Sequence, residues 1–339
     1  MATFTKLDRD TMSALLRHYS VGALVEMAPI AKGTINSNFR VDTSAGRVFL
    51  RVNEGKAREE VEYEAALVDW LSARGVVTPR VISTSEGASA AAHGSSWVTV
   101  FEWLVGREVA RDEVTPAHTA AVGAALAKMH AAGDGFPQRR AGRYTPQLIE
   151  QRYQSFVRSK DAALSRAIHV LGDELAWLAG GDRTGLPSGV IHQDLFRDNV
   201  LWSDPEAAQL GGLIDLEQAC DGAFAYDLAV CLNDWCFASD YKSDAAKAMV
   251  AGYQSVRPLT PRERGGLWIE ARAAAARFTI TRITDVHLRA AAGGAASPTD
   301  KDFRRYLARL ERLKALGRGG FSRMIGLDDV TGAMPLQRK

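Results

Sequence analysis

A short stretch near the middle of the chain limits the possible folds more than any other part of the sequence. Asp194 is followed five positions later by Asn199, and a strand-like run, 200–202, begins directly afterwards. After a turn, a second strand-like run, 212–214, leads to Asp215. The two runs predict a β-hairpin. Antiparallel pairing would bring Asn199 and Asp215 to the same end of it, with opposed Cα atoms about 4.5–5.5 Å apart.

These three polar residues form a set that is suited to phosphoryl transfer. Two oxygen-bearing side chains at that separation can share Mg²⁺, which takes hard oxygen ligands and leaves positions for phosphate oxygens. We therefore predict Asn199 and Asp215 as metal ligands. Asp194 lies just upstream, where a carboxylate can orient a hydroxyl group and accept its proton. It is predicted to be the catalytic base, with ATP and Mg²⁺ as cofactors.

The short segment between the hairpin and the next helix limits the size of the molecule that accepts the phosphate. Ten residues separate Asp215 from Tyr226, where the next helix is expected to begin. Protein kinases carry an activation segment after the corresponding aspartate, and ten residues leave no room for a long segment that would form a peptide platform. The acceptor is therefore predicted to be a small molecule that carries a hydroxyl group.

Composition and length exclude several other classes. The 339 residues suffice for two lobes, and 46% hydrophobic with 24% charged residues is ordinary for a globular protein. The net charge of +2 gives no sign of a nucleic-acid or membrane partner. The three cysteines lack zinc spacing and a disulfide pattern, and no 18-residue apolar run or signal peptide is found. We expect a cytoplasmic protein, and the oligomeric state stays open.

The secondary-structure pattern changes about one third of the way along the chain. The first part contains strand-like runs and a helix predicted over 57–73, whereas the pattern after residue 106 is almost entirely helical and includes a helix predicted over 261–288. We predict an α+β fold with two lobes. The predicted parts are a β-rich nucleotide-binding lobe over 1–104, a larger helical catalytic and substrate lobe over 105–318, and a weakly ordered tail over 319–339.

Arg51 and Glu64 are candidates for the phosphate end of the nucleotide site. Protein kinases use a strand lysine that pairs with a glutamate of the following helix. Arg51 lies at the matching strand position, and Glu64 lies on the helix, where Glu62 competes with it. An arginine can contact phosphate through two parallel hydrogen bonds. Lysine is the commoner choice, so an exposed strand arginine is the alternative interpretation.

Three more residues complete the predicted nucleotide site. Gly33 lies in a turn of small polar residues that is suited to covering phosphates, although such turns occur in many hairpins. Glu102 and Trp103 lie where the strands give way to the helical part and are expected to contact the nucleotide.

Three residues around these motifs are predicted to be structural. His192 precedes Asp194 by two positions and is expected to order the loop through hydrogen bonds rather than to bind a metal. His130 is expected to support the fold. Asp227 is expected to cap the first turn of its helix and so support the loop.

The motifs resemble those of a known superfamily. The resemblance to aminoglycoside phosphotransferases and choline kinases is carried by His192-x-Asp194-x4-Asn199, Ile214-Asp215-Leu216 and Tyr226-Asp227-Leu228-Ala229. Within that superfamily, the chain is most similar to the kinase-like homoserine kinases, in the phrases at 36–39, 194–201, 226–236 and 252–259. It departs from them at Ile35, where glutamate is usual, and at Leu216-Glu217, where Phe and an aromatic residue are usual.

The resemblance implies a fold, an activity and a substrate class. The fold would be the bilobal protein-kinase-like one, with a small β-rich N-terminal lobe and a larger helical C-terminal lobe. The activity would be transfer of phosphate from ATP, with Mg²⁺, to a small amino-alcohol, foremost L-homoserine on the route to threonine. Such a pocket needs a guanidinium group for the carboxylate and oxygen atoms for the ammonium group.

Several polar residues are candidates for this pocket. Arg277 and Arg282 lie on a late helix, and we favour Arg282 together with Asn233. The remaining candidates are Asn36, Arg197 and Asp234.

Two alternatives stay open on the sequence alone. One is a sibling kinase for choline, ethanolamine, hydroxylysine or an aminoglycoside. The other is a nucleotide-binding module without catalytic activity, for which Arg51 in place of lysine is the only sequence hint.

Overall fold

A computed structural model describes residues 5–30, 36–291, 293 and 301–327. The first part of the chain forms a six-stranded sheet in the order β1-β2-β3-β6-β4, with β5 paired to β6. All pairings in this sheet are antiparallel. The strands are β1 (Leu24–Ile30), β2 (Ser37–Thr43), β3 (Gly46–Asn53), β4 (Val81–Ile82), β5 (Ala91–His93) and β6 (Ser96–Glu102).

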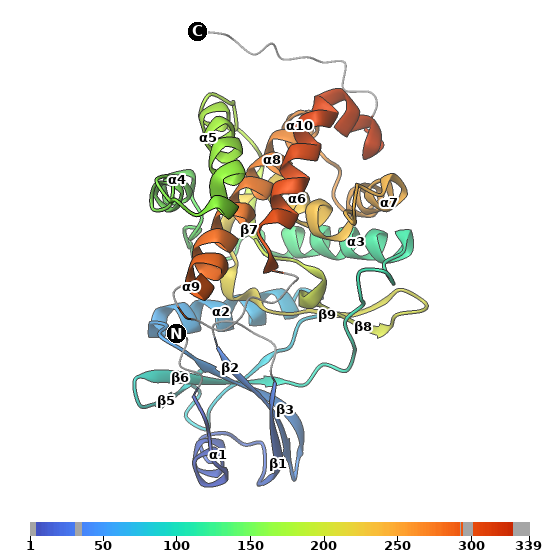
Figure 1. Ribbon diagram of the computed structural model, residues 1–339. Helices are drawn as coiled ribbons and strands as arrows, with labels where there is room; N and C mark the ends of the chain where they lie inside the picture. Colours follow the sequence, from blue (N-terminus) through green and yellow to red (C-terminus); the bar gives the residue numbers. More distant parts are fainter. Residues whose placement is uncertain (1–4, 31–35, 292, 294–300, 328–339) are drawn as a thin grey trace.

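Residues that alternate along the strands give the sheet one apolar face. In β2, Phe39 and Val41 are buried and share a cluster with Met12 of α1 (Arg9–Leu16), as the two-residue period of a strand requires. The longer helix α2 (Arg58–Ser72) lies on the other side, between the sheet and the helical region (Figure 1).

The rest of the chain is mainly helical. It also contains two antiparallel ladders, in which β7 (Ser188–Ile191) pairs with β10 (Cys220–Ala223) and β8 (Val200–Asp204) pairs with β9 (Gln209–Leu213). The helices are α3 (Pro116–Ala132), α4 (Pro146–Gln154), α5 (Ser165–Ala179), α6 (Phe224–Trp235), α7 (Ser243–Gln254), α8 (Pro261–Arg282), α9 (Leu288–Ala291) and α10 (Arg304–Met324).

Local signals explain where the major helices begin. α3 and α8 each have a threonine N-cap followed by proline in the first turn, at Thr115 and Thr260. The Thr260 side chain accepts a hydrogen bond from the Glu263 backbone, and the Glu263 carboxylate accepts one from the Thr260 backbone at 2.9 Å. This reciprocal capping satisfies backbone groups that a helix leaves unpaired.

Helix α8 lies at the centre of the helical region. Its residues from Gly266 to Thr281 are almost all buried, and it packs against α4, α5, α6 and α10 (Figure 1). A helix that is buried around most of its circumference has few positions at which a charged side chain can reach water. Any arginine in its middle therefore needs a specific environment.

The β8–β9 hairpin is fastened to the chain on both of its sides. The backbone N–H of Leu213 donates to the Val77 carbonyl at 2.9 Å. Arg107 and Trp202 exchange backbone hydrogen bonds of 3.0 and 2.9 Å. Val77 lies between α2 and β4, and Arg107 follows β6, so the hairpin is bonded both to the sheet region and to the segment that leads from it to the helical region.

The structure differs from the sequence-based prediction in two helical segments. The tail predicted to be weakly ordered from residue 319 is helical up to Met324, and Phe321 is buried. The helix has a kink at Gly317, whose φ of 63° is accessible to glycine, and the chain then resumes its helix. The helix predicted over 261–288 ends at Arg282 and continues as a π-helical turn, Ile283–His287.

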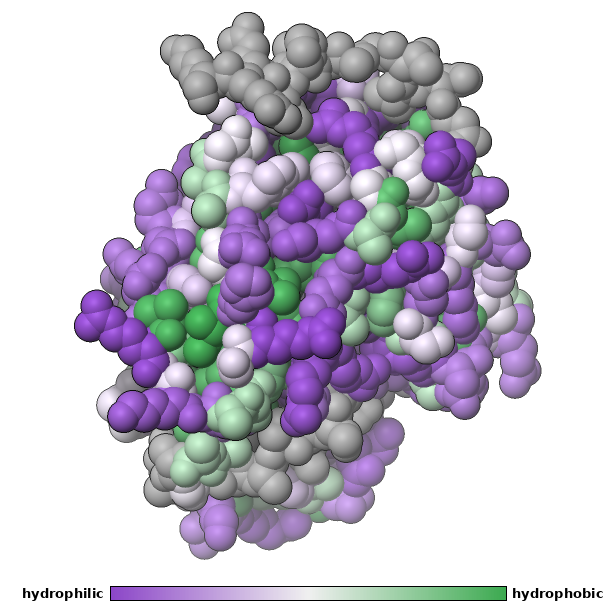
Figure 2. Space-filling view, turned by 45° about the horizontal axis from the view of Figure 1, so that its top comes forward, coloured by the Kyte–Doolittle hydropathy of each residue, from purple (hydrophilic) through white to green (hydrophobic). Residues whose placement is uncertain are grey.

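The surface is mixed in character. Figure 2 shows one face on which hydrophilic side chains cover most of the described surface, with smaller hydrophobic areas between them. Within the described ranges, no helix combines the length and the apolar character that crossing a membrane requires.

Candidate active site

The β8–β9 hairpin brings the two predicted metal ligands together. Val200 pairs with Leu213, and the Ile214 N–H donates to the Asn199 carbonyl at 3.0 Å, so Asn199 and Asp215 flank the same end of the ladder. Asp215 has a φ of 65°, a left-handed conformation that a non-glycine residue rarely adopts. Strain of this kind is concentrated at functional sites.

Asn199 also contacts the loop of the predicted base. Its Nδ2 donates a hydrogen bond of 2.8 Å to the Asp194 carbonyl. The nitrogen of the carboxamide thus faces the loop, and Oδ1 is the atom that can serve as a metal ligand. Asn199 therefore joins the predicted base to the predicted metal position.

Asp227 holds the backbone of the loop before Asp194. Its carboxylate accepts hydrogen bonds from the N–H groups of His192 and Gln193 at 2.7 and 2.8 Å. Burial alone would raise the pKa of Asp227, but the bond to His130 and the nearby histidines lower it. The predicted helix-capping role is wrong, because the N-cap of α6 is Ala223. The predicted support of the loop is confirmed.

The two histidines are structural, as predicted. The Nε2 atom of His192 lies 3.0 Å from the Ile214 carbonyl, which ties the loop to the hairpin. His130 bridges Asp227 at 3.0 Å and the Tyr253 hydroxyl at 2.8 Å.

The ion pair predicted for the nucleotide site is present. Arg51 Nη1 donates to Glu64 at 2.8 Å, and Arg51 Nη2 donates to Asp215 at 3.2 Å. Burial would lower the pKa of Arg51, but the carboxylates of Glu64 and Asp215 raise it. Glu62, the competing glutamate, pairs instead with Arg58 at the surface. Arg51 is thus buried and contacts Asp215, one of the two predicted metal ligands.

A second ion pair was missed by the sequence analysis. Lys56 Nζ and Asn36 Nδ2 each donate to the Glu217 carboxylate at 2.6 Å. Burial would raise the pKa of Glu217, but the charges of Lys56 and Arg51 hold it at about 2. The change to Leu216-Glu217 had marked this position as unusual, but nothing in the sequence pointed to Lys56 as its partner.

The two aspartates of the site have raised pKa values. Burial raises the pKa of Asp194 to about 6, although Arg277 opposes the shift. Burial and the Glu217 carboxylate raise the pKa of Asp215 to about 7. Low dielectric surroundings destabilise the charged form of both carboxylates. A cation or a hydrogen-bond donor beside either one would therefore stabilise its charged form.

The oxygen donors suit a hard divalent cation. Asp215 and Asn199 offer one carboxylate and one carboxamide oxygen, and the Asp215 side chain is 37% exposed. Within the described ranges, no group of three or more His, Cys, Asp or Glu side chains is placed to hold a metal ion. A cation at this site would therefore need further oxygen ligands from a bound nucleotide or water, as Mg²⁺ commonly has.

The remaining residues predicted to contact the nucleotide are Gly33, Glu102 and Trp103. Gly33 is outside the described residues. The Glu102 carboxylate pairs with Arg80 at 2.6 Å, and Trp103 lies beneath the Arg47 guanidinium. Their contacts with a nucleotide stay predictions.

One predicted acceptor residue is wrong. Asn233 is completely buried, donates to the Ala271 carbonyl at 2.9 Å and accepts from Tyr241 at 2.6 Å. Its carboxamide joins α6 to α8 and is not available to a substrate. It was predicted because the sequence could not show which side of α6 faces the site.

The other acceptor candidates keep their status as predictions. Asn36 contacts Glu217, Arg197 Nε pairs with Asp234 at 3.2 Å, and the Arg282 guanidinium lies over the Tyr306 ring at 4.4 Å. Arg277, the alternative to Arg282, lies closer to the predicted base, with Nη1 3.8 Å from Asp194 Oδ1.

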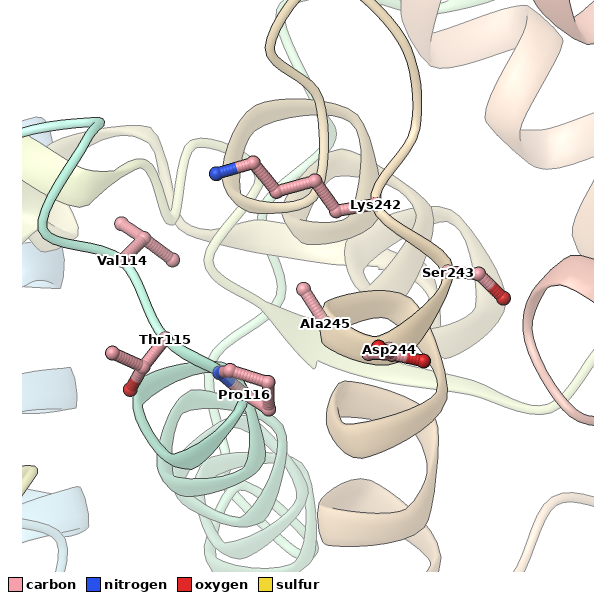
Figure 3. Close-up of a pocket in the computed structure, with 7 residues that line it drawn as sticks. All are labelled: Val114, Thr115, Pro116, Lys242, Ser243, Asp244 and Ala245. Carbon is pink, nitrogen blue, oxygen red and sulfur yellow. The ribbon is translucent and has the colours of Figure 1, made fainter.

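A separate hollow lies between the first turns of α3 and α7 (Figure 3). It is lined by Val114, Thr115, Pro116, Lys242, Ser243, Asp244 and Ala245. It shares no residue with the site around Asp194, and its lining lacks the carboxylate and amide combination described above.

The fold and the site together are those of a kinase-like phosphotransferase. The predicted base lies beside a carboxamide and a carboxylate, and a strand arginine pairs with a helix glutamate. Comparison with known proteins agrees. The chain belongs to the phosphotransferase enzyme family, whose sequence profile matches residues 26–265, and to the branch that contains the homoserine kinases.

Two curated relatives illustrate the similarity. The homoserine kinase of Caulobacter sp. strain K31 is 38% identical over 288 residues, which is 84% of this chain and 89% of the relative. The homoserine kinase of Methylobacterium nodulans is 35% identical over 326 residues, 95% of this chain and all of the relative.

Solved structures show the same fold at lower sequence identity. An amicoumacin kinase has a TM-score of 0.71 at 14% identity and covers 92% of this chain and 95% of its own. A choline/ethanolamine kinase family protein from Mesorhizobium loti has a TM-score of 0.64 at 20% identity and covers 96% and 99%. The predicted α+β kinase-like fold is thereby confirmed.

Proposed function

We propose that this protein transfers the γ-phosphoryl group of ATP to the side-chain hydroxyl of L-homoserine, with Mg²⁺ as the cation. The products are ADP and O-phospho-L-homoserine, an intermediate on the route to threonine. The observation that carries phosphoryl transfer is the hydrogen bond from Asn199 to the Asp194 carbonyl at the end of the hairpin that also presents Asp215. The homoserine kinases among the relatives support the choice of acceptor.

Asp194 is the group that acts on the acceptor. Its carboxylate orients the hydroxyl group and accepts its proton while the hydroxyl oxygen forms a bond to the γ-phosphorus. The bond between that phosphorus and the oxygen of ADP breaks, and ADP leaves with the electron pair. The Asp194 side chain is 29% exposed, so a small alcohol can reach it.

Four further residues would hold the nucleotide and cation. Asn199 Oδ1 and the Asp215 carboxylate would bind Mg²⁺, which neutralises charge on the phosphate oxygens when bound. Arg51, which Glu64 holds in place, is directed toward the same position and suits a phosphate oxygen.

The acceptor panel is the direct test. Purified protein with MgATP is supplied separately with L-homoserine, choline, ethanolamine, hydroxylysine and an aminoglycoside, and release of ADP is measured. We expect kcat/KM to be highest for L-homoserine. A clear preference for another alcohol would replace the proposed acceptor but keep the kinase. Binding of MgATP without turnover of any alcohol would favour the catalytically inactive module.

A further inference from the structure

Four arginine side chains are buried in the described part of the chain, and three of them donate at least two hydrogen bonds each to the protein. Arg51 donates to Glu64 and Asp215. Arg272 binds Glu174 through two hydrogen bonds of 2.7 and 2.5 Å. Arg309 donates to two backbone carbonyls at 2.6 Å each. These contacts compensate for the removal of each guanidinium from water.

Arg277 on α8 is the exception. It is 5% exposed, and its Nε and Nη1 atoms have no hydrogen-bond partner among the described residues. The Asp194 carboxylate, 3.8 Å from Nη1, is too far for a hydrogen bond. A buried cation that lacks such a partner is costly, so its retention needs an explanation.

Aromatic rings hold the Arg277 guanidinium in position. Its central carbon lies 3.8 Å from the centroid of Tyr144 and 3.7 Å from that of Phe278. Such cation–π contacts orient the planar group but leave its N–H bonds unused. The donor edge of Arg277 is therefore preorganised for a ligand.

Other polar atoms beside Arg277 are unpartnered as well. Asp194 Oδ1 and the Tyr226 hydroxyl are buried without a hydrogen-bond partner among the described residues. Tyr226 and Asp194 are also the ionisable groups that act most strongly on Arg277. A cation, a hydroxyl group and one carboxylate oxygen of the predicted base thus interact electrostatically but lack hydrogen-bond partners among the described residues, which is the arrangement expected where a polar ligand binds.

We propose that Arg277 is the receptor for the carboxylate of the acceptor, an inference that rests on the proposed function. A carboxylate matches the planar fork of a guanidinium through two charge-assisted hydrogen bonds. With the carboxylate on Arg277, the hydroxyl end of a short hydroxy amino acid reaches the neighbouring Asp194. Arg277 thereby selects a hydroxy amino acid over an amino-alcohol without a carboxylate, and it takes the role that the sequence had favoured for Arg282.

The test compares two acceptors that differ only in the carboxylate. L-Homoserine and 3-aminopropan-1-ol are supplied to the wild type, to Arg277→Met and to Arg277→Lys, and kcat and KM are measured. For Arg277→Met we expect kcat/KM on L-homoserine to fall about a hundredfold, mainly through KM, as for other truncated charge pairs. On 3-aminopropan-1-ol it should change less than about threefold, and Arg277→Lys should be intermediate.

The control variant is Arg262→Met, which removes a half-buried arginine about 22 Å away along the same helix. Both acceptors should be used by it as by the wild type. Equal losses of Arg277→Met on the two acceptors would overturn the inference, because Arg277 would then act through Asp194 alone. Failure of the wild type to phosphorylate L-homoserine would instead overturn the proposed function.

A measurement on the wild type covers the case in which Arg277→Met does not fold. L-2-Aminobutyrate and propan-1-amine lack the hydroxyl group and differ only in the carboxylate. We expect L-2-aminobutyrate to compete with L-homoserine and propan-1-amine to bind at least about tenfold more weakly. Equal inhibition by the two compounds would overturn the inference without any variant.

Discussion

Asp194 combines two properties that a catalytic base needs. Asn199, a predicted metal ligand, donates a hydrogen bond to the Asp194 carbonyl and so fixes the backbone of Asp194. Its side chain remains accessible to a substrate. Burial raises its pKa to about 6, which makes the carboxylate a stronger base than an exposed aspartate while it is still ionised at neutral pH.

Replacing Asp194 by asparagine removes the proton acceptor and keeps the shape of the side chain. We expect turnover to fall by about 10²–10⁴-fold. Binding of MgATP, measured by calorimetry, should be unchanged within about threefold, because Asp194 is not predicted to touch the phosphates. Turnover near the wild-type level would show that another group accepts the proton.

The raised pKa of Asp194 also predicts the pH dependence of turnover. A base must be deprotonated, and a raised pKa means that protonation begins nearer to neutral pH. We expect kcat/KM for the acceptor, at saturating MgATP, to fall about tenfold per pH unit below about pH 6. A profile that stays flat down to pH 5 would contradict this assignment.

The Lys56–Glu217 pair makes a prediction about stability. Both side chains are 7% exposed and 2.6 Å apart. Lys56→Met leaves the Glu217 charge buried without its main partner, which should cost about 3–5 kcal/mol of unfolding free energy. Urea unfolding of Lys56→Met and of Lys56→Met/Glu217→Gln tests this, and the double variant should recover part of the loss. Equal stability of the two variants would mean that the carboxylate charge is already compensated.

At the scale of elements, two helices cross so closely that only glycine fits between them. A Cβ atom on Gly252 of α7 would lie 2.1 Å from the Ala120 carbonyl oxygen of α3, and one on Gly123 of α3 would lie 2.1 Å from the Met249 carbonyl oxygen. These contacts involve backbone atoms, which cannot move aside without separating the helices.

Gly252→Ala should therefore destabilise the protein by about 1–3 kcal/mol. Gly265→Ala on α8 is the matched control, because a Cβ atom there meets nothing within 4 Å. It should be neutral or stabilising by up to about 1 kcal/mol, since alanine favours a helix. Thermal unfolding of the two variants gives the comparison, and similar melting temperatures would contradict the close crossing.

Features that depend on contiguous residues could be predicted from the sequence, whereas contacts between distant residues could not. The hairpin that holds Asn199 and Asp215 was predictable because its strands and turn are contiguous. The start of α3 was predictable because Thr115 and Pro116 carry the signal themselves. The partner of Glu217 was not predictable, because Lys56 is 161 positions away in the sequence. The status of Arg277 depends on which side of α8 faces Asp194, and tertiary packing alone decides that.

At the scale of the whole molecule, the Arg51–Asp215 ion pair is one of the contacts that join the sheet region to the helical region. Arg51 belongs to β3, and Asp215 follows β9. A nucleotide with its cation would contact both residues and so stabilise the two regions together.

MgATP at a hundred times its Kd should add about 2.7 kcal/mol to the stability of the wild type and raise Tm. Excess EDTA should remove most of this increase, because ATP alone lacks the cation that Asn199 and Asp215 would hold. Asp215→Asn should show little response to MgATP beyond its response to ATP with EDTA. An undiminished Tm increase for this variant would place the cation elsewhere.

The backbone bonds that fasten the β8–β9 hairpin to Val77 and to Arg107 have a mechanical consequence. The Val77 attachment lies within the sheet region, between α2 and β4, and the Arg107 attachment lies in the segment that leads from β6 to the helices. Because the hairpin is bonded to both regions, we expect Asn199 and Asp215, at its end, to move least in any rotation of the sheet against the helices. The two predicted metal ligands would then keep their positions relative to the cation, while the sheet and the helices move apart for the exchange of substrate and product.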